Sequence, residues 1–217
     1  MLNYLQLTKH VKQANSIFLV DDDDAVRHAL KLYLERENFI VHDYPSAEAL
    51  LEIVDKNYAS LLVLDIRMNG MSGLELQTEL KSRDIYLPIV FISGHGNIQS
   101  SVSAMKEGAA DFIEKPFDNE ELLASIHYTF KKEAEKNELD SIKSALTEKL
   151  ETLTPREQEV MGYVVDGVSN KQMAALLGVS DRTIEVHRSR VMAKMAATSL
   201  PELVRMSVLL EFDNTGP

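Results

Sequence analysis

The 217-residue chain contains no cysteine. This absence excludes disulfides, thiolate metal sites and cysteine nucleophiles, and it suits a reducing compartment such as the cytosol. No apolar run approaches the roughly 20 residues that a helix needs to cross a bilayer. Residues 1–16 lack the apolar core of a signal peptide, so we interpret them as a short leader and expect a cytoplasmic protein without a membrane partner.

Positive charge is also scarce, since 23 Lys and Arg stand against 34 Asp and Glu and give a net charge of −11. The deficit is concentrated in residues 1–152, which carry 16 basic and 26 acidic residues, a charge of −10. Residues 153–217 carry 7 and 8, a charge of −1. The length suggests two small domains, and the acidic one is a poor partner for nucleic acid.

Four short apolar runs in the acidic part each end beside a residue that can contact a phosphoryl group. The runs cover residues 17–20, 61–64, 89–92 and 111–114, and they end at Asp21 and Asp22, Asp65, Ser93 and Lys115, respectively. Short apolar runs separated by helical patterns indicate buried parallel strands. Because ligands of such sheets bind beyond the carboxyl ends of the strands, we expect these side chains to meet in one pocket.

Helical patterns alternate with these runs. They cover residues 25–36, 46–54, 72–81 and 98–106, a fifth begins near residue 118, and residues 39–41 supply one more strand. The pattern predicts an α/β fold over about residues 15–128, in which five strands and five helices form a doubly wound parallel sheet.

The three carboxylates would repel one another, and a divalent cation removes that cost. Mg²⁺ prefers oxygen ligands and keeps several waters, so Asp22 and Asp65 are the expected direct ligands, with Asp21 acting directly or through water. Asp65 stands alone before a flexible loop at residues 67–73, which makes it the expected phosphoryl acceptor. Lys115 and the Ser93 hydroxyl would then contact phosphoryl oxygens.

Each signal has a plain alternative when it is taken alone. Residues 21–24 could be a solvated turn and helix cap. A single Asp after a strand is usually a turn residue, and a Lys-Pro pair is common. The joint occurrence of these residues, in order and at strand ends, favours the phosphoryl site.

Together these residues resemble the receiver domain of two-component response regulators. The matching segments are Val20-Asp21-Asp22, Leu64-Asp65, Ile92-Ser93-Gly94 and Lys115-Pro116-Phe117. The resemblance covers about residues 15–128 and implies a flavodoxin- or CheY-like fold. It also implies that a cognate sensor histidine kinase phosphorylates Asp65, with Mg²⁺ at Asp22, Asp65 and the Arg67 backbone carbonyl and with Asp21 assisting. Mn²⁺ could substitute for Mg²⁺.

Further implications of the resemblance concern the bond before Pro116, a switch and one loop residue. The Lys115–Pro116 bond is expected to be cis. Ser93 and Phe112 match the family's switch pair, in which the hydroxyl moves toward the phosphoryl group while the ring turns inward. Ser93 replaces the commoner threonine and keeps the hydroxyl. The chain departs from the family at Asn69, where proline is usual, and we expect a more mobile loop there with activity retained.

Residues 129–152 form the expected helical linker. The segment is highly charged, and an apolar stripe continues through it to the start of the next domain, formed by Leu139, Ile142, Leu146, Leu150 and Leu153. It could extend the preceding helix. A short coiled-coil seam is the alternative, but the stripe lasts only about two heptads, so packing on the chain's own domains is favoured.

Capping signals predict four helices in residues 153–217. Two capping boxes begin at Thr154 and Ser169, a third helix starts after Ser180 and extends to about residue 196, and a fourth starts at Ser199 and ends near residue 212. The second and third helices are joined by a short turn that contains Gly178, an arrangement typical of a helix-turn-helix.

The third of these helices has two distinct faces. Ile184, Val191 and Met195 are expected to be buried. The opposite side could enter a major groove, where polar and apolar groups contact bases and cations neutralise phosphates. It presents Arg182, Glu185, Val186 and Ser189, with Arg190 and Lys194 flanking. A protein-interaction module of four helices is the alternative.

This part strongly resembles the LuxR-type helix-turn-helix. The matching segments are Leu153-Thr154-Pro155-Arg156-Glu157, Asn170-Lys171-Gln172-Met173-Ala174 and Thr183-Ile184-Glu185-Val186-His187-Arg188. The ending, residues 191–195 and 199–204, looks like the FixJ branch, so the whole chain resembles the FixJ/NarL family of response regulators. The resemblance implies promoter DNA as partner and a homodimer on phosphorylation. The implied DNA contacts are Lys171, Arg182, Thr183, Glu185, Val186, His187, Ser189, Arg190 and Lys194.

Two other function classes compete with a transcription regulator. In a haloacid-dehalogenase-like phosphatase, Asp21 would be the nucleophile and the acid two residues later the acid/base, but the helix-turn-helix would be unexplained. A pure adaptor would show no sequence-specific DNA binding. His95 lies near the expected pocket, where it is a loop residue or a pH-sensitive modulator.

Overall fold

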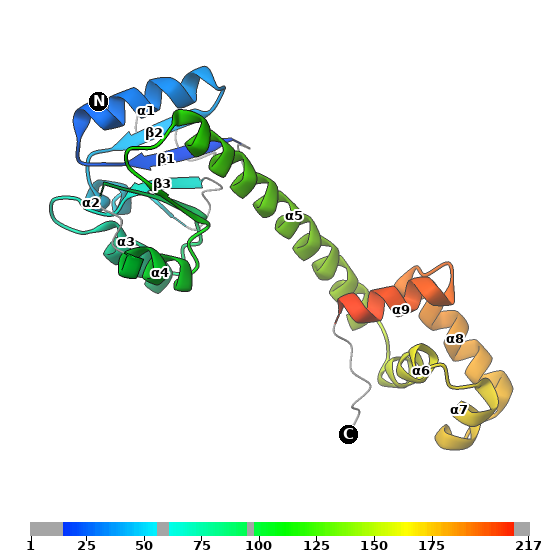
Figure 1. Ribbon diagram of the computed structural model, residues 1–217. Coiled ribbons are helices and arrows are strands. Elements are labelled where there is room, and N and C mark those ends of the chain that lie inside the picture. Colours follow the sequence, from blue (N-terminus) through cyan, green and yellow to red (C-terminus); the bar gives the residue numbers. More distant parts are fainter. Residues whose placement is uncertain (1–14, 56–60, 95–97, 211–217) are drawn as a thin grey trace, which may run out of the picture. The chain divides into compact units, whose positions relative to one another are not determined.

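The computed structural model describes residues 15–55, 61–94 and 98–210. The chain divides into two compact units, residues 1–134 and 135–217, and each is described by itself. Figure 1 labels their helices and strands.

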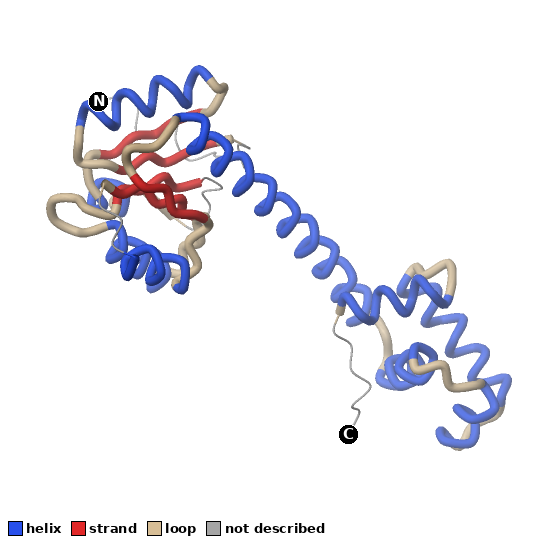
Figure 2. The backbone as a smooth tube through the Cα atoms, in the orientation of Figure 1, coloured by secondary structure: helices blue, strands red, loops and turns tan. Residues whose placement is uncertain are grey.

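The first unit contains a parallel sheet of five strands in the order β2-β1-β3-β4-β5 (Figure 2). The strands are β1 (Ser16–Val20), β2 (Ile40–Tyr44), β3 (Leu61–Asp65), β4 (Ile89–Ser93) and β5 (Asp111–Glu114). The predicted fold class is confirmed. Because β3 lies between β1 and β4, the carboxyl ends of these three strands are neighbours at the point where the strand order reverses, and such points bind ligands in doubly wound sheets.

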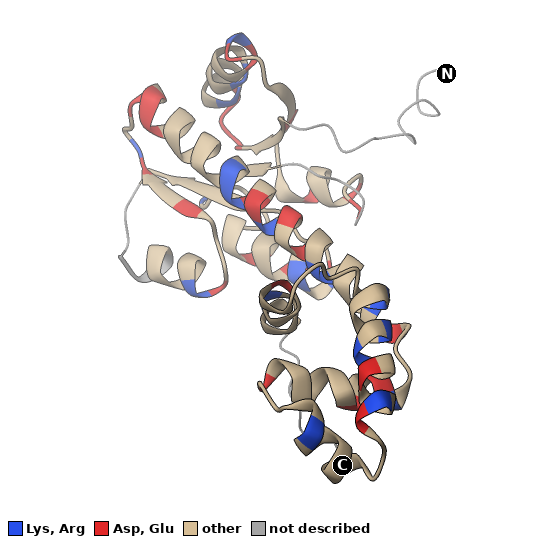
Figure 3. Ribbon diagram, turned by 90° about the vertical axis from the view of Figure 1, so that its right-hand side faces the viewer, with Lys and Arg blue, Asp and Glu red and all other residues tan. Residues whose placement is uncertain are grey.

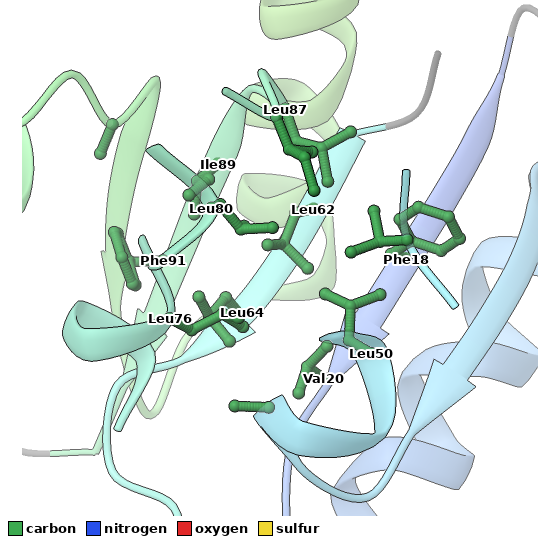
Figure 4. Close-up of a cluster of buried hydrophobic side chains, with 14 of the residues drawn as sticks. Phe18, Val20, Leu50, Leu62, Leu64, Leu76, Leu80, Leu87, Ile89 and Phe91 are labelled. Atoms are coloured by element: carbon green, nitrogen blue, oxygen red, sulfur yellow. The ribbon is translucent and has the colours of Figure 1, made fainter. Parts of the chain in front are cut away.

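Five helices cover the two faces of this sheet. They are α1 (Asp24–Arg36), α2 (Ala47–Leu51), α3 (Gly73–Ser82), α4 (Ile98–Lys106) and α5 (Asn119–Glu151). One core cluster joins strand residues such as Phe18 and Leu64 to Leu50 of α2 and Leu76 of α3 (Figure 4). The alternate strand residues pack against α1 and the start of α5. Burial on both faces explains why the central strands are continuous apolar runs.

Two predicted boundaries differ from the observed ones. Strand β2 extends to Tyr44, because it pairs with β1 from Ser16↔Ile40 to Val20↔Tyr44. Helix α2 begins after the N-cap Ser46 as predicted, but it ends at Leu51 and not at Val54.

The second unit contains the four predicted helices, α6 (Pro155–Val165), α7 (Asn170–Leu177), α8 (Asp181–Met195) and α9 (Leu200–Leu209). Both predicted capping boxes form, and Gly178 ends α7 in the left-handed region at φ 66°. The last helix ends earlier than predicted, since α9 stops at Leu209 with Leu210 as its C-cap and does not reach residue 212. The four helices surround one core that includes Val160, Met173, Ile184 and Leu203.

Helix α5 is a single helix of 33 residues that includes the expected linker. Lys residues are interspersed with Asp and Glu along it (Figure 3). Leu122 and Ile126 belong to the core of the first unit, whereas Leu150 packs against the core of the second. Leu139 and Ile142 are each 43% exposed. Over the described ranges, α5 included, no helix combines the length and apolar content of a membrane span.

Candidate functional site

The pocket of the first unit begins with two buried carboxylates at the ends of adjacent strands. Strands β1 and β3 pair in register, with Val20 opposite Leu64, so the residues that follow, Asp21 and Asp65, lie beside each other. They are 1% and 5% exposed. Buried charges need partners, and the partner here comes from a third strand end.

Lys115 follows β5 and bridges the two carboxylates. Its Nζ lies 2.7 Å from Oδ2 of Asp21 and 2.8 Å from Oδ1 of Asp65. Its backbone N–H donates to the Ser93 carbonyl at 2.7 Å, and the predicted cis Lys115–Pro116 bond is confirmed. One ammonium between two buried carboxylates leaves a net negative charge, so this edge of the sheet favours a further cation.

Burial and ion pairing shift the pKa values of this cluster in opposite directions. Desolvation raises the pKa of Asp65 above its ordinary value, and the nearby Lys115 offsets only part of that rise. Burial by itself lowers the pKa of Lys115, but its hydrogen bonds to Asp21 and Asp65 together outweigh burial, so the pKa of Lys115 is raised. The lysine therefore stays charged at neutral pH.

Backbone N–H groups hold the remaining carboxylate oxygens. Asp65 Oδ2 accepts from the Arg67 N–H at 2.7 Å, and Asp21 Oδ1 accepts from the Asp23 N–H at 2.9 Å. Asp22 points to the loop after β3, where its Oδ2 accepts from both the backbone N–H and the side-chain amide of Asn69, at 2.9 and 2.8 Å. The expectation of a more mobile loop stays a prediction, but this double contact opposes it.

No three acidic or histidine side chains among the described residues are grouped so that they could hold a metal ion. Mg²⁺ does not require such a group, because it is usually bound through one or two carboxylates and keeps several waters. Mg²⁺ prefers oxygen ligands, and three are present here: the carboxylates of the buried Asp65 and the half-buried Asp22, and the backbone carbonyl of the exposed Arg67. These groups fit the ion, with two carboxylates as direct ligands.

The expected switch pair occupies adjacent strands. Ser93 ends β4 and is 2% exposed, and Phe112 lies on β5 partly buried against the first core cluster. Strand pairing places Ser93 opposite Glu114 and Ile92 opposite Asp65. Ser93 therefore follows directly after the residue that lies opposite Asp65 in the neighbouring strand. His95 lies outside the described residues, so the pH-sensitive modulator stays a prediction.

Three supporting residues of the pocket were not predicted. Arg27 of α1 donates from Nη1 to the Asp21 carbonyl at 2.8 Å and pairs with Asp24 and Asp43. Glu48 of α2 accepts from the Met71 N–H at 2.9 Å, and Gly73 packs directly against the Asp65 carbonyl. The Arg27–Asp43 and Glu48–Met71 contacts join segments that become neighbours only through folding, so the local sequence carries no signal for them.

In the second unit, α7, the turn at Gly178 and α8 form the predicted helix-turn-helix. Ile184, Val191 and Met195 are 0%, 1% and 0% exposed, as predicted. The outer side of this unit carries six exposed residues that were named as candidate DNA contacts: Lys171, Arg182, Glu185, Val186, Ser189 and Arg190. This face combines cations with groups that can contact bases.

Comparison with known proteins bears on both units. A family model described as "Response regulator receiver domain" matches residues 17–127, and one described as "Bacterial regulatory proteins, luxR family" matches residues 151–207. The transcriptional regulatory protein FixJ of Azorhizobium caulinodans is 42% identical over 193 residues, which cover 89% of this chain and 92% of that protein.

The chain belongs to the FixJ-type response regulators.

Other relatives agree with this assignment. Nodulation protein W of Bradyrhizobium diazoefficiens is 42% identical over 89% of this chain and 86% of that protein. The solved structure of the response regulator StyR is 39% identical, covers 89% of this chain and 98% of its own and has a TM-score of 0.76. Full-length FixJ from B. japonicum is 35% identical, covers 93% and 98%, and has a TM-score of 0.57. The FixJ-type regulator is thus a DNA-binding transcriptional regulator, and the phosphatase and adaptor alternatives are set aside.

One candidate DNA contact of this FixJ-type regulator has a different role in the structure. The ammonium of Lys194 lies 2.6 Å from Glu157 Oε2 and 2.9 Å from the Thr152 carbonyl. Lys194 and the Thr154 N–H hold the pKa of the 2% exposed Glu157 at about 2. Because this pair neutralises a buried carboxylate, the ammonium of Lys194 is engaged within the domain. Its phosphate contact stays a prediction, which this ion pair opposes.

Thr183 and His187 are only partly exposed, unlike the six exposed candidates of this FixJ-type regulator. The Thr183 hydroxyl lies 2.8 Å from that of Ser180 at the start of α8. Nδ1 of His187 is buried and has no hydrogen-bond partner among the described residues. Arg188, whose role was not predicted, donates to Asn170 Oδ1 at 3.0 Å and so ties α8 to α7.

Proposed function

We propose that this cytoplasmic regulator is switched by phosphoryl transfer from a sensor histidine kinase to Asp65. The observation that carries the proposal is the Lys115 ammonium held between Asp21 and Asp65 at three strand ends. In the transfer, the phosphorus–nitrogen bond of the kinase phosphohistidine breaks while a phosphorus–oxygen bond to Asp65 forms. Lys115 is then positioned to neutralise one phosphoryl oxygen, and the Ser93 hydroxyl to donate to another.

The proposal includes a Mg²⁺ ion, for which Mn²⁺ can substitute. Asp22, Asp65 and the Arg67 carbonyl would hold it, with Asp21 assisting, and it would supply neutralisation of phosphoryl charge. Asp21 meanwhile orients Lys115, and the Arg67 N–H orients Asp65. Because these groups are already ordered, the pocket itself would promote both the phosphotransfer and the later hydrolysis of phosphoaspartate.

The output step of the proposal is dimerisation. A shift of Ser93 and Phe112 would alter the surface made of α4, β5 and α5. Val102 and Met105 on α4 are 46% and 47% exposed, an apolar area that association would cover. A single helix-turn-helix module buries only about 600–1,000 Å² on DNA, so joining two copies raises affinity through effective concentration. The two recognition helices would then lie one helical turn apart on a pseudo-palindromic promoter site.

Phosphorylation tests the receiver half of the proposal. After incubation with Mg²⁺ and a small-molecule phosphodonor, and with the cognate kinase once it is identified, wild-type protein should gain one phosphoryl group and shift to a dimer in size exclusion. Asp65→Asn should gain none and stay unshifted, because the acceptor oxygen is replaced. Asp84→Asn, which changes an aspartate of the α3–β4 turn, is the matched control and should behave as wild type. Peptide mass spectrometry that located the phosphoryl group on Asp21 would contradict the proposal.

DNA binding tests the other half. With a site selected from random DNA by the phosphorylated protein, Lys171→Ala and Arg190→Ala should each weaken binding across sequences and reduce the salt slope by about 1, as expected for phosphate contacts. Glu185→Ala should instead relax base preference at one position, by about 1–3 kcal/mol. Equal salt slopes in all variants would contradict these assignments.

A further inference from the structure

We propose that Asn69 is a positioning residue that fixes Asp22 for a divalent cation. The inference rests on the proposed Mg²⁺ site. Asn69 is not itself one of the proposed Mg²⁺ ligands. Two donors of Asn69, its backbone N–H and its side-chain amide, converge on the single oxygen Oδ2 of Asp22, at 2.9 and 2.8 Å. Hydrogen bonds to a carboxylate are charge-assisted and directional, so the plane of this carboxylate is set by Asn69.

The contact joins two segments that are 47 residues apart in the chain. Asp22 follows β1, whereas Asn69 lies in the loop after β3, two residues beyond Arg67. The oxygen ligands expected from Asp22 and from the Arg67 carbonyl therefore come from different loops. The Asn69–Asp22 contact connects those loops, so it limits how far the two ligand oxygens can move apart. Mg²⁺ demands near-ideal octahedral geometry, and its affinity is sensitive to such spacing.

Both donors use the same oxygen of Asp22, and this leaves Oδ1 for the cation. Among the described residues, no hydrogen bond engages Oδ1, while Asp21 and Asp65 are each held at both oxygens. Asp22 is thus the pocket carboxylate with the most freedom to bind, and Asn69 is what orders it. Asparagine supplies both donors at this position; alanine would keep only the N–H, and proline would supply neither.

Glu48 of α2 provides a matched control, because it contacts the same loop. Its Oε1 accepts from the Met71 N–H at 2.9 Å, so it tethers the loop at a point two residues after Asn69. Unlike Asn69, it contacts none of the proposed ligands. A general loosening of the loop would follow from removing either tether, whereas loss of Asp22 orientation would follow only from changing Asn69.

The experiment measures Mg²⁺ affinity by calorimetry on the unphosphorylated full chain. It compares wild type with Asn69→Ala, Asn69→Pro, Asn69→Ser and Glu48→Ala. The melting temperature in EDTA is recorded for each. Removal of a residue that orients a metal ligand typically costs about 10- to 100-fold in affinity, and we expect the lower end because the contact is exposed. Asn69→Pro should bind more weakly still, Glu48→Ala should bind as wild type, and Asn69→Ser, which restores a side-chain donor, should recover part of the affinity.

Each other outcome overturns the inference in a recognisable way. Affinity unchanged in Asn69→Ala would mean that Asp22 needs no positioning. Tighter binding would mean that Asn69 competes with the cation. Equal weakening in Asn69→Ala and Glu48→Ala would indicate loop anchoring in general. If wild type itself bound no Mg²⁺, the proposed metal site would fail together with the inference, and this result differs from all the others because it appears in the unaltered chain.

Discussion

Replacing Lys115 by methionine is expected to lower the free energy of unfolding by about 3 kcal/mol in EDTA. The lysine is the shared partner of Asp21 and Asp65, whose side chains are 1% and 7% exposed. Methionine fills much of the same volume but leaves two adjacent carboxylates buried without a cation. We expect the lower end of the usual cost for breaking a buried pair because the lysine side chain is 23% exposed.

Two conditions should reduce this loss. Mg²⁺ should restore part of the stability, because a ligand that binds only the folded state stabilises it. Lower pH should also reduce the loss of stability. Burial raises the pKa of Asp65, so the charged carboxylate destabilises the folded state. This destabilisation decreases as pH falls through the folded-state pKa, because the carboxyl group then becomes protonated. Chemical denaturation at neutral and acidic pH, with and without Mg²⁺, measures both effects.

Lys81→Met is the matched control for this experiment. Lys81 pairs with Glu107 at 2.8 Å, but the two side chains are 69% and 52% exposed, and exposed pairs contribute at most about 1 kcal/mol. A Lys115 variant as stable as the Lys81 variant in EDTA would show that water solvates the acid pocket well enough without the lysine.

Gly73→Ala is expected to destabilise the first unit by about 3 kcal/mol and to impair phosphorylation. A Cβ at this position would lie 2.4 Å from the Asp65 carbonyl oxygen and 3.1 Å from the Ile66 Cα. Backbone atoms cannot move aside as a flexible side chain can, so either α3 or the end of β3 must shift; the cost lies at the upper end of the usual range for overpacking. A displaced strand end would move the acceptor carboxylate away from Lys115.

Thermal and denaturant unfolding, together with the extent of phosphorylation, measure the two consequences. Gly94→Ala is the control, because a Cβ at Gly94 meets no atom within 4 Å, although this glycine also follows a strand of the pocket. If Gly73→Ala were as stable and as readily phosphorylated as Gly94→Ala, the close packing of α3 on the Asp65 carbonyl would not matter to the site.

Several elements followed from local sequence signals. Capping boxes at Thr154 and Ser169 form as predicted, because a cap is made between residues three positions apart and needs no distant partner. The buried side of α8 was also correct, since helical spacing alone places Ile184, Val191 and Met195 on one face. Strand β2 was less well predicted, because its length depends on pairing with β1.

Local periodicity in the sequence is enough to predict the chemical groups at the strand ends and the residues that face each core. Which of these groups become partners depends on the packing of distant segments. Lys194 pairs with Glu157, 37 residues away, although its position in α8 suggested a phosphate contact. Asn69 binds Asp22, although an asparagine in place of the family's usual proline suggested a more mobile loop. Such pairings depend on how helices and loops far apart in the chain pack together. A local sequence pattern does not specify which distant residue becomes the partner.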